Sequence, residues 1–231
     1  MLVIAAGGNL SSRTALEIFE FLKEGFSRYP SMLIVPTATS DPKNFEEIRK
    51  FWADIFKNVE ILPLHKKVNV NLTEEELRNA VNKHDFVFFS GGDQKRIINL
   101  IRGHDFHRIL LERSSKEDFA VGGTSAGAAA LGDLCILSGS PSRFYSVKVT
   151  QGLGFLKGYV VDQHFKERKR FGRLIHVVNE NKLKGVGVDE DTAAVFIPEG
   201  SLIKVLGSGY VWFFERVGEN KIQLNFIKRQ N

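Results

Sequence analysis

The chain has 231 residues, 43% of them hydrophobic, and a formal net charge of +5. No Pro/Ser-rich or charge-block linker divides it, so we expect residues 1–231 to form a single α/β domain. No apolar stretch approaches the roughly 20 residues of a membrane span, and the single cysteine, Cys135, excludes an internal disulfide, so we expect a soluble, cytoplasmic protein.

Short apolar runs, each ended by Gly, Pro or a small polar residue, indicate buried strands. They span residues 2–6, 32–38, 59–64, 86–91, 119–123 and 134–139. Apolar residues at helical spacing predict helices over residues 13–26, 44–56, 73–84 and 94–116. This alternation predicts a mainly parallel sheet with helices on both faces, of the flavodoxin-like kind, and the pattern after residue 140 favours additional antiparallel strands.

Glycine-rich segments follow three of the expected strands. They are "GGNLSSR" (7–13), "SGGDQ" (90–94) and "GGTSAG" (122–127). Ligands of a parallel sheet bind at the carboxyl ends of its strands, so we expect these three loops to form the site.

Ser125 stands in "GTSAG", which fits the G-x-S-x-G pattern of a nucleophile elbow. In such an elbow a strand turns sharply into a helix, the serine is exposed at the bend, and flanking glycines avoid collisions. The backbone N–H of Ala126, at the start of the helix, can then bind an oxyanion. The alternatives are a tight turn with a capping serine or a turn that binds phosphate, and the strand before and helix after Ser125 favour the elbow.

An elbow also needs a second oxyanion donor and a base. The glycine pair in "SGGDQ" offers exposed N–H groups, with Gly92 as the candidate donor, and Gln94 can hydrogen-bond a substrate amide; an ordinary turn is the alternative. Among the six histidines, His164 follows an apolar run and lies between a carboxylate and several arginines. We therefore select His164 as the candidate base.

Two charged segments admit other interpretations. The run "FKERKRFGR" (165–173) is the densest basic cluster, but it contains a glutamate and lacks interleaved stacking aromatics, so we expect no nucleic-acid partner. The run "VDEDTA" (188–193) has three carboxylates but no His or Cys at ligand spacing. We expect no metal there and no cofactor elsewhere.

Four motifs together resemble peptidase family S51, whose types include cyanophycinase and aspartyl dipeptidase. They are "FFSGGDQ", "GGTSAGAA", "DQHFKERKRFGR" and "GVGVDEDTA", in this order. The resemblance implies a class I glutamine amidotransferase-like fold and a serine exopeptidase that acts beside aspartyl residues, as on cyanophycin, an aspartate backbone with an arginine on each side-chain carboxyl. It also implies a homodimer.

Carried over to this sequence, the resemblance makes Ser125 the nucleophile and His164 its base, with Gly92 and Ala126 as the oxyanion hole. The substrate pocket would comprise Gln94, Asp162, Gln163, Arg168, Arg170 and Arg173. Arginine forks suit the carboxylates of an aspartyl substrate, and Asp162 or another acid could hold an arginine guanidinium.

The third catalytic group is open. The family places an acid shortly after the serine, but the corresponding window, "SGSPSR" (138–143), has no carboxylate. Either Asp191 or Glu190 orients His164, or a dyad works with a polar helper such as Ser142, or activity is lost. The last case would leave a non-catalytic protein that binds aspartyl or arginine peptides; the intact Ser125, His164 and glycine pair favour the enzyme.

Overall fold

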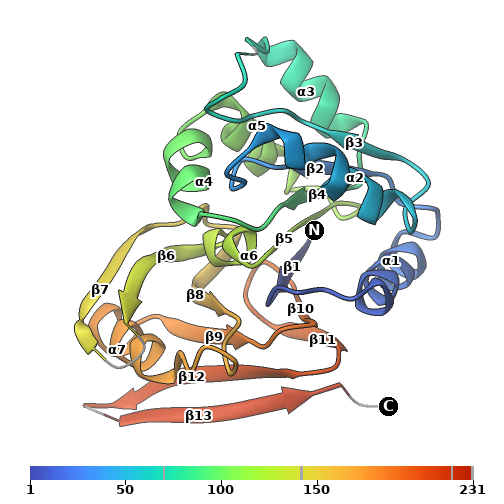
Figure 1. Cartoon of the computed structure of the whole chain (residues 1–231). Coiled ribbons are helices and arrows are strands. Elements are labelled where there is room, and N and C mark those ends of the chain that lie inside the picture. Colours follow the sequence, from blue (N-terminus) through green and yellow to red (C-terminus); the bar gives the residue numbers. More distant parts are fainter. Residues whose placement is uncertain (70, 141–142, 220, 230–231) are drawn as a thin grey trace.

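The computed structural model describes residues 1–69, 71–140, 143–219 and 221–229, and it arranges them as two β-sheets with helices around them (Figure 1). The larger sheet has seven strands in the order β11-β10-β1-β5-β4-β2-β3. The smaller sheet has six strands in the order β13-β12-β9-β8-β6-β7. The predicted fold class is confirmed, while the interpretation of residues 1–231 as one domain stays a prediction.

The centre of the larger sheet is parallel, because β1, β5, β4, β2 and β3 pair in parallel, whereas β10 and β11 join its other edge in antiparallel orientation. Its inner strands are buried on both faces, which explains their unbroken apolar sequences. The strands are β1 (Leu2–Ala6), β2 (Met32–Val35), β3 (Val59–Ile61), β4 (Phe86–Phe89), β5 (Ala120–Thr124), β10 (Thr192–Phe196) and β11 (Leu202–Gly207).

The strands of the larger sheet direct alternate side chains to two cores. On β4, Phe86 and Phe88 pack with Trp52 and other residues on one face, and Val87 and Phe89 pack on the opposite face. The second of these cores also contains buried residues of the smaller sheet, such as Val186. The two sheets therefore share one core.

Each of the four segments that apolar spacing predicts as helical contains a helix, with one difference, and α7 (Phe171–Asn181) was not predicted. Residues 94–116 were expected to form one helix, but they form α4 and α5, because the chain turns at Gly103, whose φ is +81°, and His104 caps the next helix by accepting from the Phe106 N–H. The helices are α1 (Ser12–Phe26), η1 (Pro42–Asn44), α2 (Phe45–Ala53), α3 (Glu74–Asn82), α4 (Gln94–Ile101), α5 (Asp105–Arg113), α6 (Ala126–Ala130) and α7 (Phe171–Asn181).

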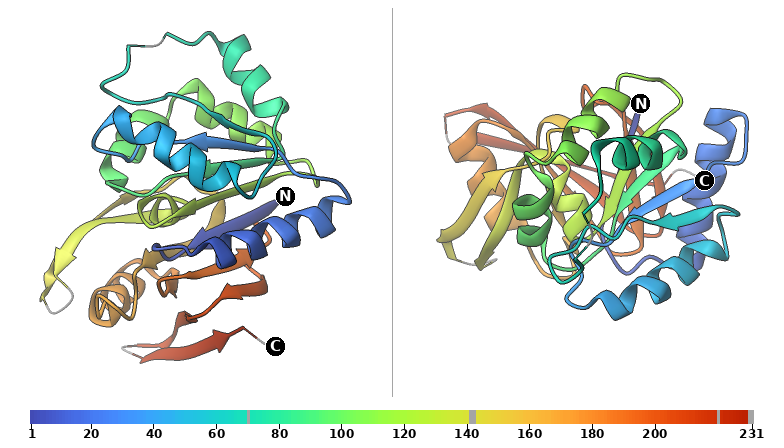
Figure 2. Two further views of the ribbon diagram at one scale, coloured as in Figure 1. Left: turned by 45° about the vertical axis from the view of Figure 1, so that its right-hand side comes forward. Right: turned by 90° about the horizontal axis from the view of Figure 1, so that it is seen from above.

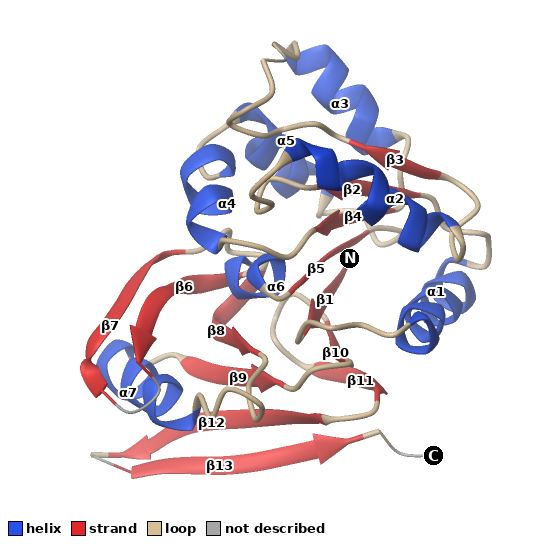
Figure 3. Ribbon diagram, in the orientation of Figure 1, coloured by secondary structure: helices blue, strands red, loops and turns tan. Residues whose placement is uncertain are grey.

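Most of the strands that follow α6 form the smaller sheet, whereas β10 and β11 belong to the larger one (Figure 3). The run expected as a strand at 134–139 belongs to it and not to the parallel sheet. Its pairings are parallel between β6 and β8 and between β8 and β9, and antiparallel elsewhere. Its strands are β6 (Gly132–Ser140), β7 (Arg143–Gln151), β8 (Leu156–Gln163), β9 (Lys184–Val188), β12 (Tyr210–Gly218) and β13 (Lys221–Lys228).

One edge strand of the smaller sheet is β13, which lies at the bottom of Figure 1 and of the left view of Figure 2. Among the helices of the described residues, none is long and apolar enough to cross a membrane.

Candidate active site

Ser125 stands at a sharp bend between β5 and α6. Its backbone angles are φ 51° and ψ −112°, far from either a strand or a helix, and its N–H donates to the Ala6 carbonyl at 2.9 Å. A Cβ at Gly123 would lie 2.5 Å from the Gly127 carbonyl carbon, and one at Gly127 would lie 2.2 Å from the Phe89 carbonyl oxygen. Both flanking glycines of the G-x-S-x-G pattern are therefore required by close backbone packing.

A continuous line of hydrogen-bonding atoms runs from Ser125 through His164 to Glu190. The Ser125 Oγ lies 2.8 Å from the His164 Nε2, and the His164 Nδ1 lies 2.6 Å from the Glu190 Oε1. The imidazole is buried, with a side-chain exposure of 6%, whereas the Glu190 side chain is 28% exposed. This arrangement has the geometry of a nucleophile, a base and an orienting acid.

The other two candidates for the third group are placed differently. The Asp191 carboxylate accepts from the Ser11 N–H at 2.8 Å and from the Ser208 hydroxyl at 3.0 Å, which ties the end of β9 to α1 and to the β11–β12 turn. Ser142 lies outside the described residues. Of the two acids that the sequence left open, Glu190 is the one in contact with His164.

The end of β1 and the loop after it hold the three chain segments that carry this line. Three successive carbonyls, those of Ala6, Gly7 and Gly8, accept from the backbone N–H groups of Ser125 at 2.9 Å, His164 at 2.8 Å and Asp191 at 2.8 Å, respectively. A Cβ at Gly8, whose φ is +108°, would lie 2.2 Å from the His164 Cε1. The glycine-rich segment 7–13 was expected to border the site, but its part in fixing the three loops was not foreseen.

Asn9, in the same loop, was also missed by the sequence analysis. Hydrogen bonding from the Asn9 side chain, and then from His164, holds the pKa of Glu190 below its ordinary value, against the opposing effect of burial. Asn9 adopts a φ of 47°, a left-handed conformation that asparagine tolerates better than most residues. Its position directly after the glycine pair is the signal that could have identified it.

Burial determines the protonation of His164. Burial lowers the pKa of the imidazole, the hydrogen bond with Glu190 raises it, and the positive charges of Arg168 and Arg170 lower it. The net direction is downward from the ordinary value of 6.5. The imidazole is therefore neutral at neutral pH, the form that can accept a proton from Ser125.

Backbone N–H groups border Ser125 on its other side. A Cβ placed on Gly91 would lie 3.5 Å from the Ser125 Cβ, so the "SGGDQ" loop is next to the serine. Gly92 has a φ of +140° and packs against the Ala38 carbonyl, where a Cβ would lie 2.1 Å from the oxygen. No acceptor for the Gly92 N–H occurs among residues 1–69, 71–140, 143–219 and 221–229, and Ala126 is the first residue of α6, where N–H groups have no intrahelical acceptor.

The predicted pocket residues Gln94, Gln163 and Arg168 have three different environments. The Gln163 Oε1 lies 3.4 Å from the Ser125 Oγ. Gln94 instead donates from its Nε2 to the Ile136 carbonyl at 2.8 Å, which ties α4 to β6. Arg168 is exposed, and its guanidinium has no ion-pair partner in the described part of the chain, so this cation is available to a ligand beside His164.

Asp162, Arg170 and Arg173 bind one another inside the protein. Asp162 is 1% exposed and accepts from the Arg170 Nη1 at 2.9 Å and from the Arg173 Nε at 2.6 Å, with a further close contact from the Arg173 Nη2. Arg170 also donates to the Gln163 carbonyl at 2.7 Å. Asp162 is therefore not free to hold a substrate guanidinium, and the two buried arginines are engaged by Asp162 instead of pointing an open fork at a substrate carboxylate.

The three carboxylates of the "VDEDTA" run have different hydrogen-bond partners. Asp189 accepts from the Trp212 Nε1 at 2.9 Å and from the backbone N–H groups of Lys166 and Tyr210, both at 3.1 Å, and burial raises its pKa. Glu190 contacts His164, and Asp191 contacts Ser11. Within the described residues no group of three or more His, Cys, Asp or Glu is arranged to hold a metal ion.

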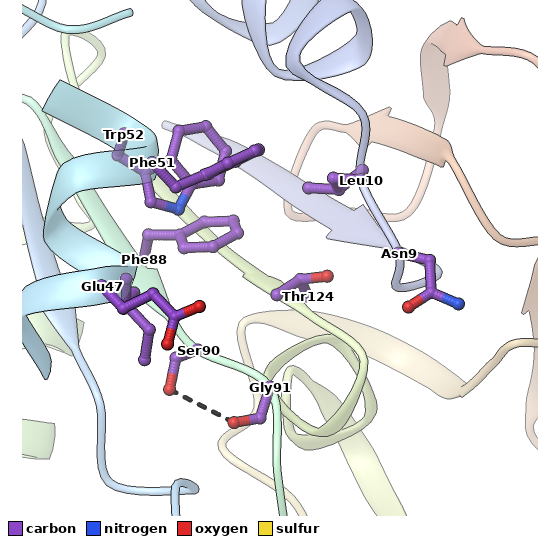
Figure 4. A pocket seen from close by; sticks show the side chains of 10 residues that line it. Asn9, Leu10, Glu47, Phe51, Trp52, Phe88, Ser90, Gly91 and Thr124 are labelled. Atoms are coloured by element: carbon purple, nitrogen blue, oxygen red, sulfur yellow. Dashed lines mark hydrogen bonds between the residues drawn. The ribbon is translucent and has the colours of Figure 1, made fainter. Parts of the chain in front are cut away.

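An open pocket of about 390 Å³ lies beside Ser125 and was not predicted from the sequence (Figure 4). Gly91 and Thr124, which adjoin the serine, form one wall. The remaining lining residues come from the β1 loop, α2 and β4: Asn9, Leu10, Glu47, Ile48, Phe51, Trp52, Phe88 and Ser90.

Comparison with known proteins identifies a peptidase family. The family model described as peptidase family S51 matches residues 1–205. The cyanophycinase of Synechococcus elongatus is 36% identical over 188 residues, which cover 77% of this chain and 56% of that protein. The cyanophycinase of Trichormus variabilis is 34% identical over 219 residues, which cover 90% of this chain and 72% of that protein. This chain thus matches little more than half the length of the Synechococcus relative.

The fold is also shared with a solved structure. A peptidase from an acI-B1 actinobacterium superposes with a TM-score of 0.72 at 18% identity, covering 98% of this chain and 96% of that chain.

Proposed function

We propose that this chain, which belongs to peptidase family S51, is a serine-type peptidase that hydrolyses peptides at aspartyl residues with Ser125, His164 and Glu190 as its catalytic groups. The observation that carries the proposal is the hydrogen-bonded line from the Ser125 Oγ to the His164 Nε2 at 2.8 Å and from the His164 Nδ1 to the Glu190 Oε1 at 2.6 Å.

The proposed reaction has two steps. Ser125 attacks the amide carbonyl while the neutral His164 accepts the hydroxyl proton, and the imidazolium then gives that proton to the leaving amine, which leaves an acyl-enzyme. Water, deprotonated by His164, then releases the acid and restores Ser125. Glu190 holds the imidazole in the tautomer with its proton on Nδ1 and stabilises the positive charge that forms in each step.

The oxyanion of each tetrahedral intermediate is proposed to bind the N–H groups of Gly92 and Ala126. Gly92 follows Gly91, which packs next to Ser125, and Ala126 follows Ser125 at the start of α6, which adds the positive end of its helix dipole. Gln163, 3.4 Å from the Ser125 Oγ, and the exposed Arg168 are the proposed contacts for the polar backbone and the carboxylate of the substrate.

The proposed substrates are β-aspartyl-arginine polymers of the cyanophycin type or small aspartyl peptides. The support is the similarity to two proteins named cyanophycinase. The alternative, a non-catalytic protein that binds such peptides, was motivated by the missing acid in the 138–143 window; Glu190 now offers a carboxylate from another part of the chain, so no observation favours that alternative.

The test is hydrolysis of purified cyanophycin and of a panel of α- and β-aspartyl dipeptides, with Ser125→Ala alongside and the exposed Ser12→Ala as a matched control. We expect Ser125→Ala to lose at least a thousandfold in rate and Ser12→Ala to retain full activity. A fluorophosphonate label should attach to Ser125 and not to the alanine variant. Unchanged hydrolysis by Ser125→Ala would refute the mechanism, and cleavage of dipeptides alone would refute the polymer as substrate.

We further propose that the protein is a cytoplasmic homodimer. The edge strand β13 exposes Leu224, Phe226 and Ile227, with Phe226 at 59%, and an open strand edge can pair with a second copy. Cys135 is buried, and burial raises the pKa of its thiol to about 12, so it is an unreactive thiol suited to a reducing compartment. Light scattering after gel filtration should give twice the chain mass, and Phe226→Lys should give the monomer.

A further inference from the structure

We propose that the pocket beside Ser125 binds the guanidinium-bearing side chain next to the bond that is cleaved, with Glu47 as the residue that selects the cation. This inference deepens the proposed function and rests on it. It names the site that would distinguish arginine-bearing substrates from other aspartyl peptides.

The pocket lies next to Ser125. Thr124 precedes Ser125 in the chain, Gly91 packs next to it, and both line the pocket. A peptide whose carbonyl carbon is held at the Ser125 Oγ therefore has this pocket within reach of the side chain attached beside that carbonyl. The pocket volume, about 390 Å³, is of the size that takes a small-molecule group.

The lining of the pocket combines aromatic residues with one carboxylate. Phe51, Trp52 and Phe88 are gathered at one end of the pocket (Figure 4); Trp52 and Phe88 are buried, and Phe51 is the partly exposed ring that can contact a ligand. Glu47 contributes the only carboxylate among its lining residues. An apolar cavity with an accessible aromatic ring and a single negative charge suits a planar cation on an apolar stem, because a guanidinium can stack on an aromatic face while it donates to a carboxylate.

Glu47 has no ion-pair partner among the described residues. Glu47 and Phe51 lie four residues apart on α2 and so share the helix face that lines the pocket. The adjacent Glu46 pairs with Arg49 at 2.7 Å, whereas no described cation lies within ion-pair distance of Glu47. Asp162, the acid expected to receive a substrate guanidinium, is occupied by Arg170 and Arg173. Glu47 is therefore the acid beside the serine that remains available for this role.

The decisive comparison is between arginine and citrulline, which has the same shape but a neutral ureido group. The probes are a short peptide of β-aspartyl-arginine units and its citrulline counterpart, and kcat/KM is measured for the unmodified protein, Glu47→Gln and the matched control Glu46→Gln. The unmodified protein and Glu46→Gln should prefer arginine by about ten- to a hundredfold, the effect of a hydrogen bond to a charged group. In Glu47→Gln that preference should disappear, and an unchanged circular dichroism spectrum shows that the variant folds.

A retained arginine preference in Glu47→Gln would overturn the proposal. A binding measurement needs no catalytic turnover, so it distinguishes failure of the pocket proposal from failure of the proposed peptidase function. Calorimetric titration of the arginine peptide into Ser125→Ala and into Ser125→Ala/Glu47→Gln should show a loss of about tenfold or more in affinity. If no protein cleaves either peptide but this loss is seen, the pocket stands and the peptidase function fails; equal affinities overturn the pocket.

Discussion

Two acidic residues close to the end of β8 have opposite surroundings. Glu190 is 28% exposed and contacts a single neutral ring, that of His164, at 2.6 Å. Asp162 is 1% exposed and lies between two guanidiniums, those of Arg170 and Arg173, which are themselves 9% and 7% exposed. The first acid remains near solvent beside a group that can change its charge, and the second is enclosed with charges that do not change.

The different surroundings of Glu190 and Asp162 indicate a chemical role for the first and a structural role for the second. The Glu190 carboxylate can stabilise an imidazolium that forms during a reaction, because among the described residues its ion-pair contact is with His164. Asp162 compensates two buried cations, and burial lowers the pKa of Arg170 despite the neighbouring carboxylate. Both arginines come from the same run as His164, so this part of the basic cluster forms a buried ion network around Asp162 and not the open substrate clamp that the sequence suggested.

The largest expected effect comes from Glu190→Gln. The amide retains the shape but neither holds the required imidazole tautomer nor stabilises its charge, so kcat should fall about a thousand- to ten-thousandfold. The exposed Glu167, whose carboxylate accepts from the Glu190 N–H at 3.2 Å, provides the control, and Glu167→Gln should lose less than tenfold. Steady-state kinetics on any cleaved aspartyl peptide tests this, and a loss below tenfold for Glu190→Gln would remove it from the catalytic groups.

Asp162→Asn should act on stability. Removing the charge leaves two buried guanidiniums without compensation, which costs about 3–5 kcal/mol in the free energy of unfolding. Glu46→Gln, which breaks an exposed pair with Arg49, should cost less than about 1 kcal/mol. Urea titration followed by circular dichroism gives both values, and similar values for the two variants would contradict the structural role of Asp162.

Asn9→Gly should have a smaller effect on the rate. Glycine accepts the left-handed backbone at this position, so the substitution removes the side chain without straining the loop. Without the hydrogen bond from Asn9 the pKa of Glu190 rises toward its ordinary value and the carboxylate is less well oriented. We expect kcat to fall about tenfold with KM unchanged, a loss equal to one hydrogen bond. An altered KM with an unchanged kcat would show that Asn9 acts on substrate binding and not through Glu190.

The smallest expected effect is on the pH dependence of kcat/KM, which reports the pKa of His164. The base must be neutral, so kcat/KM should rise with pH through the pKa of His164 and reach its plateau above it. Because burial lowers that pKa, the midpoint should lie below 6.5. Arg168→Ala removes a charge that lowers the pKa and should move the midpoint upward, whereas Glu190→Gln should move the residual midpoint downward. Shifts in the reverse directions would contradict this account.

Much of the fold and part of the site follow from local sequence. Unbroken apolar runs require burial on both faces of a sheet, and helical spacing requires one apolar face; both are properties of neighbouring residues. The elbow at Ser125 is local for the same reason, since Gly123 and Gly127 meet across a single turn. His164 could be selected by its company in one continuous run.

The partners of these residues were decided by the tertiary structure. Glu190 is 26 residues from His164, and the parallel pairing of β8 with β9, with Gln163 opposite Val188, brings the two together. The pocket similarly joins the β1 loop, α2 and β4, which meet only when the parallel sheet has formed. Charge pairing has no fixed sequence spacing, so the same run of letters is compatible with a free arginine at 168 and with neutralised ones at 170 and 173. The sequence alone therefore determined which residues can do chemistry, and packing across the two sheets decided which of them face one another.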